Sequence, residues 1–422
     1  MNRLEKYPKY KDSGVEWLGE IPEEWKVKKL KFLGKIYAGL TDKKGNDFSK
    51  NKKGDLEPFI PFTNIFNNVV INDNEFQYVR IKKNEYQNIV QKGDILFLMS
   101  SETLEDIGKT ALYNSNTKVF LNSFCKGFNV KQEKINSYYL NWLLQSNGYR
   151  TYFSIVGRGF TRINIKQDYV NNLLTILPPQ PEQIKIANYL DKKTAQIDNA
   201  ISLKEQMIER LKERRQIIIN EAVTKGLDKT VTMKDSGVEW IDEIPEGWEV
   251  KKLKYILKIN NGQDYKHIVA DDGYPVIGSG GEFAKASEYL YDGEVLLLGR
   301  KGTINKPLYF IGKFWTVDTM FYAVVKNEYI TKFMYYSSLS IPFNYYSTST
   351  ALPSMTQFNL NNHQVSIPSK QEQQEIIDFI ENQISKIDNV IDLQQKQIDK
   401  LKEYKTSLIE AIVTGKVRVC DE

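Results

Sequence analysis

The chain has 422 residues, of which 41% are hydrophobic and 26% charged, and a net charge of +5; these values are typical of a globular protein of two to four domains and permit nucleic-acid binding. No apolar run approaches the about 18 residues that span a membrane, and the first residues contain no signal-peptide core, so we expect a cytoplasmic protein without a membrane partner. Two cysteines, Cys125 and Cys420, exclude a disulfide framework and a cysteine-rich zinc site, and two histidines, His267 and His363, offer little for metal binding or acid–base catalysis.

The first predicted element is a box of 21 residues, KDSGVEWLGEIPEEWKVKKLK, which runs from Lys11 to Lys31. Nearly the same residues recur 223 positions later, from Lys234 to Lys254. Trp25 and Trp248 are predicted to be core anchors, and VKKLK alternates apolar and basic residues as a half-buried strand does. The box is therefore interpreted as packing, and we expect no active site in it.

The region after the first box contains a predicted buried strand, Ile95 to Leu98, followed by a polar loop. Basic and hydroxyl side chains in such loops suit contacts to DNA phosphates and base edges. A Lys-rich segment from Thr41 to Asp55 is expected to be mobile and to suit phosphates. The candidate DNA-binding residues of this region are Lys43, Lys44, Ser100, Lys109, Arg158, Thr161, Arg162 and Lys166.

A long helix is predicted next, because apolar residues recur at alternating spacings of four and three over about four heptads. PPQP precedes the helix, and Gly226 is expected to end it. The residues of its predicted apolar seam are Leu190, Ile197, Ile201, Ile208, Leu211 and Ile218.

The region after the second box repeats this pattern, with a predicted strand from Val295 to Leu298 and different loops. The loop GRKGTINK places cations directly after the strand, with glycines that let the backbone approach a ligand. Arginine suits bidentate contact to guanine, and lysine suits phosphate. The candidate DNA-binding residues here are Ser279, Arg300, Lys301, Lys306, Thr350 and Gln357.

A second long helix follows, and its residues match those of the first at an offset of 190. Lys204 and Gln394, like Arg215 and Lys405, interrupt the two seams at matching positions, where they fix the register or extend to solvent. The first helix ends close to the second box, so antiparallel pairing would satisfy both seams and form a spacer of at most about 64 Å. The seam of the second helix comprises Ile380, Ile387, Ile391, Ile398, Leu401 and Leu408.

The predicted organisation is thus two similar heads, related by a pseudo-two-fold axis and held apart by an antiparallel coiled coil. The expected boundaries are 1–178 for the first recognition domain, 179–228 for the central spacer helix, 229–368 for the second recognition domain, 369–416 for the C-terminal spacer helix and 417–422 for a tail.

The duplicated SGVEW…IPE.W.VKKLK box and the PPQPEQIKIANYLD lead-in resemble the specificity (S) subunits of type I restriction–modification enzymes, and the resemblance covers the whole chain. It implies two α/β (α+β) target-recognition domains in tandem, each reading one half of a bipartite double-stranded DNA site. It also implies two methyltransferase (M) subunits and restriction/translocase (R) subunits as partners, and a non-catalytic role for this chain.

Two other classes of function are alternatives for this chain. A self-sufficient nuclease or methyltransferase would need a cofactor motif, and the sequence has neither a G-x-x-x-x-G-K-[ST] loop nor an NPPY/F motif, so we predict no cofactor and no catalytic residue. Glu102, Asp106 and Lys109 could imitate a nuclease cluster, but these residue types are too common to indicate one. A two-headed architectural scaffold that binds protein at both ends is the remaining alternative, and it leaves the loops rich in Arg, Lys and Gly unexplained.

Overall fold

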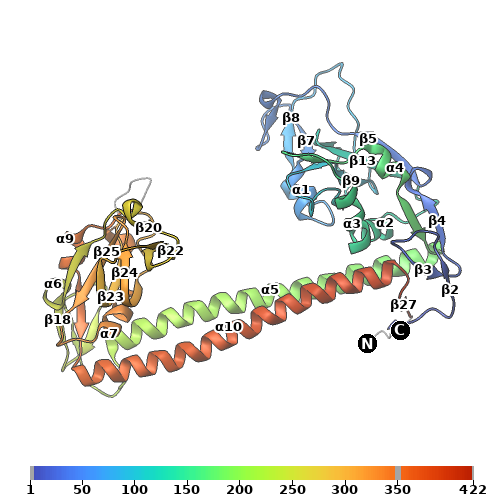
Figure 1. The fold of residues 1–422 in the computed structure, drawn as a ribbon. Helices are drawn as coiled ribbons and strands as arrows, with labels where there is room; N and C mark the ends of the chain where they lie inside the picture. Colours follow the sequence, from blue (N-terminus) through green and yellow to red (C-terminus); the bar gives the residue numbers. More distant parts are fainter. Residues whose placement is uncertain (1–3, 347–352, 421–422) are drawn as a thin grey trace. The chain divides into compact units, whose positions relative to one another are not determined.

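The computed structural model describes residues 4–346 and 353–420, which form two compact units (Figure 1). The first unit comprises Met1–Ser202 and Gln397–Glu422, and the second comprises Leu203–Lys396. Each unit therefore contains one globular region together with part of each long helix.

The two long helices are α5 (Gln180–Lys225) and α10 (Lys370–Val413), within three residues of the predicted ranges. Within each unit the two helices lie side by side (Figure 1). In the second unit, Lys204 bonds to Gln394 and Arg215 pairs with Asp388, so the helices there run antiparallel. The predicted seam residues are all buried or half-buried, as the spacing of four and three requires.

The polar residues predicted to interrupt the seams make equivalent contacts. The Lys204 ammonium donates to the Gln394 side-chain oxygen at 2.9 Å, although these two residues occupy matching positions of the repeat. The ion pair of Lys405 with Asp198 in the first unit, at 2.7 Å, corresponds to that of Arg215 with Asp388 in the second, at 3.1 Å. Each unit therefore contains the same cross-helix ion pair.

The globular region of the first unit is built on two four-stranded sheets. Its core includes Phe97, whose ring makes edge contacts with Phe128 and Phe153. The antiparallel sheet has the order β11-β9-β13-β5, and its strands are β5 (Gly34–Ala38), β9 (Ile95–Leu98), β11 (Thr110–Leu112) and β13 (Cys125–Val130). The mixed sheet has the order β12-β7-β8-β6, and its strands are β6 (Phe48–Ser49), β7 (Glu57–Ile60), β8 (Gln77–Val79) and β12 (Phe120–Leu121).

Short strand pairs and helices complete the first unit. The pairs are β1 (Leu4–Glu5) with β27 (Arg418–Val419), β2 (Tyr10–Asp12) with β3 (Glu20–Pro22), β4 (Lys26–Lys29) with β15 (Leu174–Leu177), and β10 (Ser100–Ser101) with β14 (Ile163–Asn164). The helices are α1 (Phe62–Asn67), α2 (Ser137–Gln145), α3 (Asn147–Val156) and α4 (Gln167–Asn172), with 3-10 turns at Leu30–Phe32, Gly45–Asp47 and Asp73–Glu75.

The globular region of the second unit is built on one seven-stranded sheet of order β19-β25-β23-β24-β21-β22-β20. The strands are β19 (Leu257–Asn261), β20 (Val269–Ala270), β21 (Tyr274–Gly278), β22 (Gly281–Ala286), β23 (Tyr291–Gly299), β24 (Leu308–Thr316) and β25 (Met320–Val325). The two pairs β16 (Met233–Asp235) with β17 (Glu243–Pro245) and β18 (Glu249–Lys252) with β26 (Gln364–Ile367) lie outside this sheet. The helices are α6 (Leu253–Ile256), α7 (Thr331–Ser338), α8 (Phe343–Tyr346) and α9 (Gln357–Asn362), with a 3-10 turn at Lys266–Ile268.

The repeated box joins the start of each globular region to the start of its long helix. Trp25 and Trp248 are fully or almost fully buried, as predicted for core anchors. The strand of each box, β4 or β18, pairs with the strand that leads directly into the long helix, β15 or β26. Each strand is shorter than VKKLK, because Leu30 and Leu253 begin helical turns after it.

No helix in the described part of the chain is both long enough and apolar enough to cross a membrane.

Candidate nucleic-acid interface

The loop that follows strand β9 in the first unit lies against the Arg-rich segment near residue 160. Ser100 pairs with Asn164 in a short antiparallel ladder, and the Ile165 amide donates to the Met99 carbonyl at 3.0 Å. Helix α4 begins directly afterwards, at Gln167. Residues separated by more than 60 positions in the sequence are thus brought to one edge of the sheet.

The loop that follows strand β23 in the second unit has the same surroundings. Lys301 pairs with Ser354, and the Met355 amide donates to the Arg300 carbonyl at 2.9 Å. Helix α9 begins directly afterwards, at Gln357. In both globular regions, therefore, the end of one strand, β9 or β23, lies against the segment that leads into a short helix, α4 or α9. We call this shared arrangement the frame; the side chains on it differ between the two regions.

A glycine keeps this edge compact in both units. A Cβ atom on Gly39 would lie 2.1 Å from the Asn122 carbonyl oxygen, and one on Gly262 would lie 2.1 Å from that of Val317. A side chain at either position would clash with this carbonyl oxygen, so only glycine fits there. The 223-residue offset relates these two glycines, but sequence reasoning did not single them out because each lies just beyond the box.

The Arg-rich segment of the first unit forms a β-hairpin closed by two backbone hydrogen bonds between Arg158 and Asn164, of 3.1 and 2.9 Å. Arg158, Thr161 and Arg162 are exposed on it, as is Lys166 just beyond it. Ser100, in contrast, is only 7% exposed, because its strand pairs with the base of the hairpin. A direct contact of the Ser100 side chain with a ligand would require the hairpin to move.

The two arginines of this hairpin are held differently. The Arg158 guanidinium donates to the carbonyls of Ile155 and Gly157, so it stabilises the base of the hairpin. The Arg162 guanidinium lies 5.0 Å from the ring centroid of Phe124, which is itself 52% exposed. An arginine stacked on an exposed ring keeps its donors available to phosphate or to a base edge.

The Lys-rich segment is more ordered than expected at Lys43. Its ammonium contacts Glu85 and the Arg80 carbonyl, and only 4% of its side chain is exposed. The hydrogen bond from Lys43 lowers the pKa of the Glu85 carboxyl to about 2. Lys43 therefore lacks the free side chain that sequence reasoning expected, whereas Lys44 is exposed.

Lys109 lies at the start of strand β11 and is partly neutralised. It pairs with Asp106 at 2.7 Å and lies 4.0 Å from the ring centroid of Phe66. About one third of its side chain is exposed, so it remains accessible to an anion from one side.

In the second unit, Arg300 and Ser279 lie near the same segment, Asp318–Thr319. The Arg300 amide donates to the Thr319 carbonyl at 2.8 Å, and its guanidinium donates to that of Asp318. Ser279 lines an open hollow together with Asp318 and Thr319. The frame thus brings together two candidates that are 21 positions apart.

The remaining candidates of the second unit have different surroundings. Lys301 and Lys306 are exposed. The Gln357 side-chain amide donates to the Ile259 carbonyl at 2.9 Å, so this group stabilises the frame. Thr350 lies outside the described residues.

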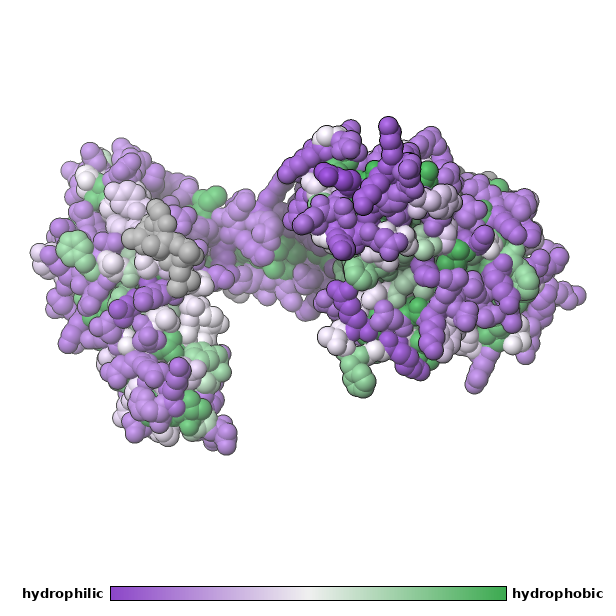
Figure 2. Space-filling model, turned by 90° about the horizontal axis from the view of Figure 1, so that it is seen from above, coloured by the Kyte–Doolittle hydropathy of each residue, from purple (hydrophilic) through white to green (hydrophobic). Residues whose placement is uncertain are grey.

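Aromatic side chains at this edge were missed by sequence reasoning, which searched for polar groups. Phe124 underlies Arg162, and Phe160 is fully exposed on the hairpin between Gly159 and Thr161. The signal that could have revealed Phe160 was an apolar residue inside a loop of Gly, Arg and Thr. In Figure 2, most of the visible surface of each unit is hydrophilic, with hydrophobic groups scattered over it.

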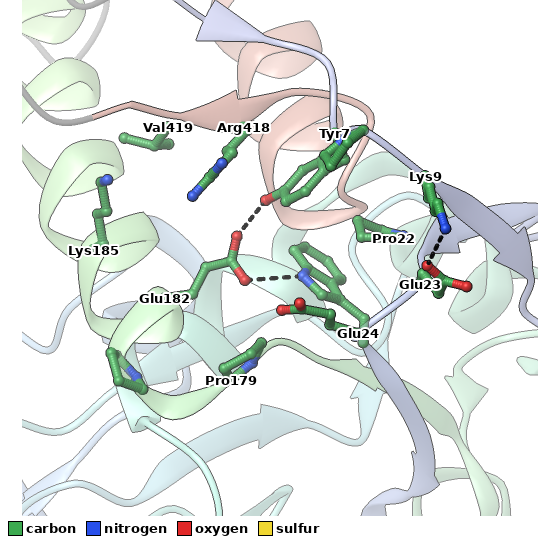
Figure 3. Close-up of a pocket in the computed structure, with 13 residues that line it drawn as sticks. Tyr7, Lys9, Pro22, Glu23, Glu24, Pro179, Glu182, Lys185, Arg418 and Val419 are labelled. Atoms are coloured by element: carbon green, nitrogen blue, oxygen red, sulfur yellow. Dashed lines mark hydrogen bonds and ion pairs between the residues drawn. The ribbon is translucent and has the colours of Figure 1, made fainter.

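A separate hollow of about 700 Å³ lies beside the first box (Figure 3). At its centre the Glu182 carboxylate accepts hydrogen bonds from the Tyr7 hydroxyl at 2.6 Å and from the Trp25 indole at 3.1 Å. Lys9 and Arg418 are among the charged residues around it. Because Trp248 bonds to Glu372 in the same way, this contact recurs in the second unit.

Among the described residues, no group of His, Cys, Asp and Glu side chains is arranged to hold a metal ion.

Most of the chain matches a known protein family. Residues 22–213 and 245–403 match the family described as "Type I restriction modification DNA specificity domain". The two matched segments each contain one globular region and part of a long helix.

Comparison with individual proteins agrees with this match. The chain is 28% identical to a putative type I restriction enzyme specificity subunit, MjaX, of Methanocaldococcus jannaschii, over 95% of this chain and 96% of the relative. Among solved structures it is similar to a chain of a type I R-M system (TM-score 0.74, 12% identity, 93% of this chain and 98% of the other). It is also similar to the HsdS subunit from Thermoanaerobacter tengcongensis (TM-score 0.54, 13% identity, 94% and 98%). These likenesses support a fold of two tandem domains of mixed helix and sheet.

Proposed function

The chain belongs to the family of type I restriction–modification DNA specificity subunits, and from this premise we propose that its two globular regions each read one half of a bipartite double-stranded DNA site. The family's role is recognition, and the chain is the non-catalytic subunit that directs methylation and restriction. The functional parts are recognition domains at 1–178 and 229–368, spacer helices at 179–228 and 369–416, and a tail at 417–422.

One observation above all supports the proposal that each globular region reads one half of the DNA site. The two regions share a frame, in which the end of β9 or β23 lies against the segment that leads into α4 or α9. The side chains carried on that frame differ between the regions. A common scaffold with different polar loops is expected of two modules that perform the same task on different sequences.

In the first region, the proposed contacts come from the hairpin and from lysines of the same region whose side chains are at least partly exposed. Arg162, stacked on Phe124, is placed to contact a base edge or a phosphate, whereas Thr161 offers a hydroxyl. Lys44, Lys109 and Lys166 suit phosphates. Arg158 and Ser100 act mainly by supporting the hairpin.

In the second region, Arg300 is the proposed base reader. Its backbone is held by Thr319, so the direction of its side chain is constrained, and arginine is the side chain that best matches guanine. Lys301 and Lys306 are exposed and suit phosphates. Ser279 lies near Arg300, and its hydroxyl can accept or donate a hydrogen bond at the same surface.

The long helices would form an antiparallel coiled coil that fixes the gap between the half-sites. The burial of the seam residues supports this proposal, as do the ion pairs of Asp198 with Lys405 and of Arg215 with Asp388, which occupy matching positions. Because ion pairs and polar contacts at defined seam positions select one register, they would select one gap.

The proposed partners are two methyltransferase subunits and restriction/translocase subunits. The similarity to a chain from a type I R-M system supports partners of this class. Leu203 and Leu393 occupy matching positions on the two helices and are 57% and 53% exposed. Exposed leucines at equivalent positions are suited to two copies of one partner. The complex would act in the cytoplasm, and this chain would need no cofactor.

The test is to co-express the chain with its methyltransferase partner and to map methylated adenines across a genome. We expect one split motif with a fixed gap. A contiguous motif would contradict two-part reading. Absence of methylation from a complex that forms would support the architectural alternative.

A further inference from the structure

Phe160 occupies an unusual position for a phenyl side chain. It lies at the tip of the hairpin between Arg158 and Asn164, and its exposed fraction is 110% of the reference value. Transfer of such a ring out of water is favourable by about 2–3 kcal/mol, and the folded chain does not obtain this stabilisation. A single exposed apolar residue needs no explanation on an ordinary surface, but this one is held out on a supported structure.

The hairpin that carries Phe160 is braced at its base. Asn164 pairs with both Arg158 and Ser100, and its side-chain amide donates to the Arg162 carbonyl at 3.1 Å. Ile163 is 9% exposed and anchors the hairpin to the core. The backbone therefore presents the ring at a defined place, which reduces the entropy lost when the ring binds.

The tip requires a glycine beside Phe160. Gly159 has a φ of +148°, and a Cβ atom there would lie 1.8 Å from the Arg162 carbonyl oxygen. This close approach of Gly159 to Arg162 makes the turn tight, and the phenyl ring projects from it into solvent.

The hairpin that carries the ring is basic, which favours a polyanionic partner. The stretch from residue 157 to residue 166 contains Arg158, Arg162 and Lys166 and no acidic residue. Arg162 lies over Phe124, so a second exposed ring is next to the hairpin. Because Arg158 is engaged by backbone carbonyls, Arg162 and Lys166 are the cations available to phosphates beside the ring. A projecting apolar ring with cations beside it is typical of side chains that wedge between base pairs.

We propose that Phe160 is a wedge that enters the base stack of the half-site bound by the first unit and unstacks one base step. The inference rests on the proposed function and adds a mode of reading to it. Since base steps differ in the energy needed to unstack them, the wedge makes the first half-site sensitive to DNA deformability as well as to base edges.

The experiment uses the complex of the full chain with its methyltransferase partner and a duplex that carries the mapped split motif. 2-Aminopurine, which becomes brighter when it is unstacked, is placed at one position at a time in both half-sites. Wild type is compared with Phe160→Ala and with Phe160→Leu, which keeps a smaller apolar side chain. The control is Phe32→Ala, because Phe32 is 56% exposed and precedes β5 at the end of that strand away from the hairpin.

We expect fluorescence to rise on binding at one step of the first half-site that is distinct from the methylated adenine. Phe160→Ala should abolish this rise and weaken specific binding about ten-fold, as loss of a base–aromatic stack does. Phe160→Leu should retain part of both effects, and Phe32→Ala should match wild type.

Two results would overturn the wedge while leaving the proposed function intact. One is a specific complex whose aminopurine signal is the same in wild type and Phe160→Ala. The other is an equal loss of affinity for the motif and for random DNA without any change in stacking, which would make Phe160 a non-specific contact. A complex that prefers no sequence would overturn both the proposed function and the wedge.

Discussion

The Trp25 indole donates a hydrogen bond to the Glu182 carboxylate at 3.1 Å, and Trp248 donates to Glu372 at 3.2 Å in the other unit. The box and the first turn of the long helix are therefore joined by one tryptophan–glutamate contact in each half. This contact gives a structural reason for the tryptophan that recurs in both boxes, because both boxes attach a globular region to a long helix in the same way.

Replacement of Trp25 by Phe should destabilise the first unit by about 1–2 kcal/mol, because the aromatic packing remains while a donor to a half-buried carboxylate is lost. Hydrogen exchange in the complete chain should show faster opening at β4 and β15 and unchanged protection at β18 and β26. Trp248→Phe should show the reverse pattern. The control is Trp17→Phe, at a ring that is 40% exposed and packs on Tyr149. An equal effect of Trp17→Phe and Trp25→Phe would contradict a role for the hydrogen bond.

Acidification should destabilise the second unit through His363. Its ring stacks on Trp240 and bonds to the Tyr346 hydroxyl, and burial lowers its pKa to about 4. In the unfolded chain the imidazole titrates near pH 6.5, so between pH 6.5 and 4 the unfolded state binds a proton that the folded state does not. Stability should fall by up to about 3 kcal/mol as the pH falls through this window, and this group should cause no further loss below it.

Urea unfolding at several pH values tests this behaviour. His363→Gln should flatten the stability profile between pH 6.5 and 4, whereas His267→Gln, at an exposed position, should leave the profile as in wild type. Identical profiles for the two variants would show that His363 is not the group responsible.

The two cysteines should differ in reactivity. Burial raises the pKa of the Cys125 thiol, and Cys125 is 1% exposed, whereas Cys420 is partly exposed. Since the thiolate is the nucleophile, a disulfide reagent should modify one thiol per native chain rapidly and both after denaturation. Rapid modification of Cys125 in the native chain would show that the hydrophobic core of the first unit opens readily.

Lengthening both long helices should lengthen the gap in the DNA motif. Seven residues inserted after Ser202 in α5 and seven before Gln397 in α10 preserve the seam, because the seam repeats every seven residues. The insertion extends each helix by about 10 Å, which corresponds to about three base pairs of duplex. Methylation mapping should reveal the same half-sites with the longer gap, and insertion in α5 alone should abolish methylation. An unchanged gap in the double insertion would refute the spacer proposal.

The parts of the fold that repeat within the chain were predictable from the sequence. The long helices begin and end within three residues of their predicted bounds because their apolar spacing is sustained and duplicated, and Ile95–Leu98 is a strand as expected. The surroundings of single side chains were not predictable. Lys43 is neutralised by Glu85, and Ser100 is covered through its pairing with Asn164, and neither partner has a local signal in the sequence. Contacts of this kind depend on how loops return to the sheet.

The most direct test of one half-site per unit is the methylation motif of the variants Arg162→Ala and Arg300→Ala, each mapped in the complete complex. We predict that Arg162→Ala relaxes or weakens recognition of one half-site about ten-fold, that Arg300→Ala does so for the other, and that the gap is unchanged in both. Loss of the same half-site in both variants, or a uniform loss of methylation on every sequence, would contradict it.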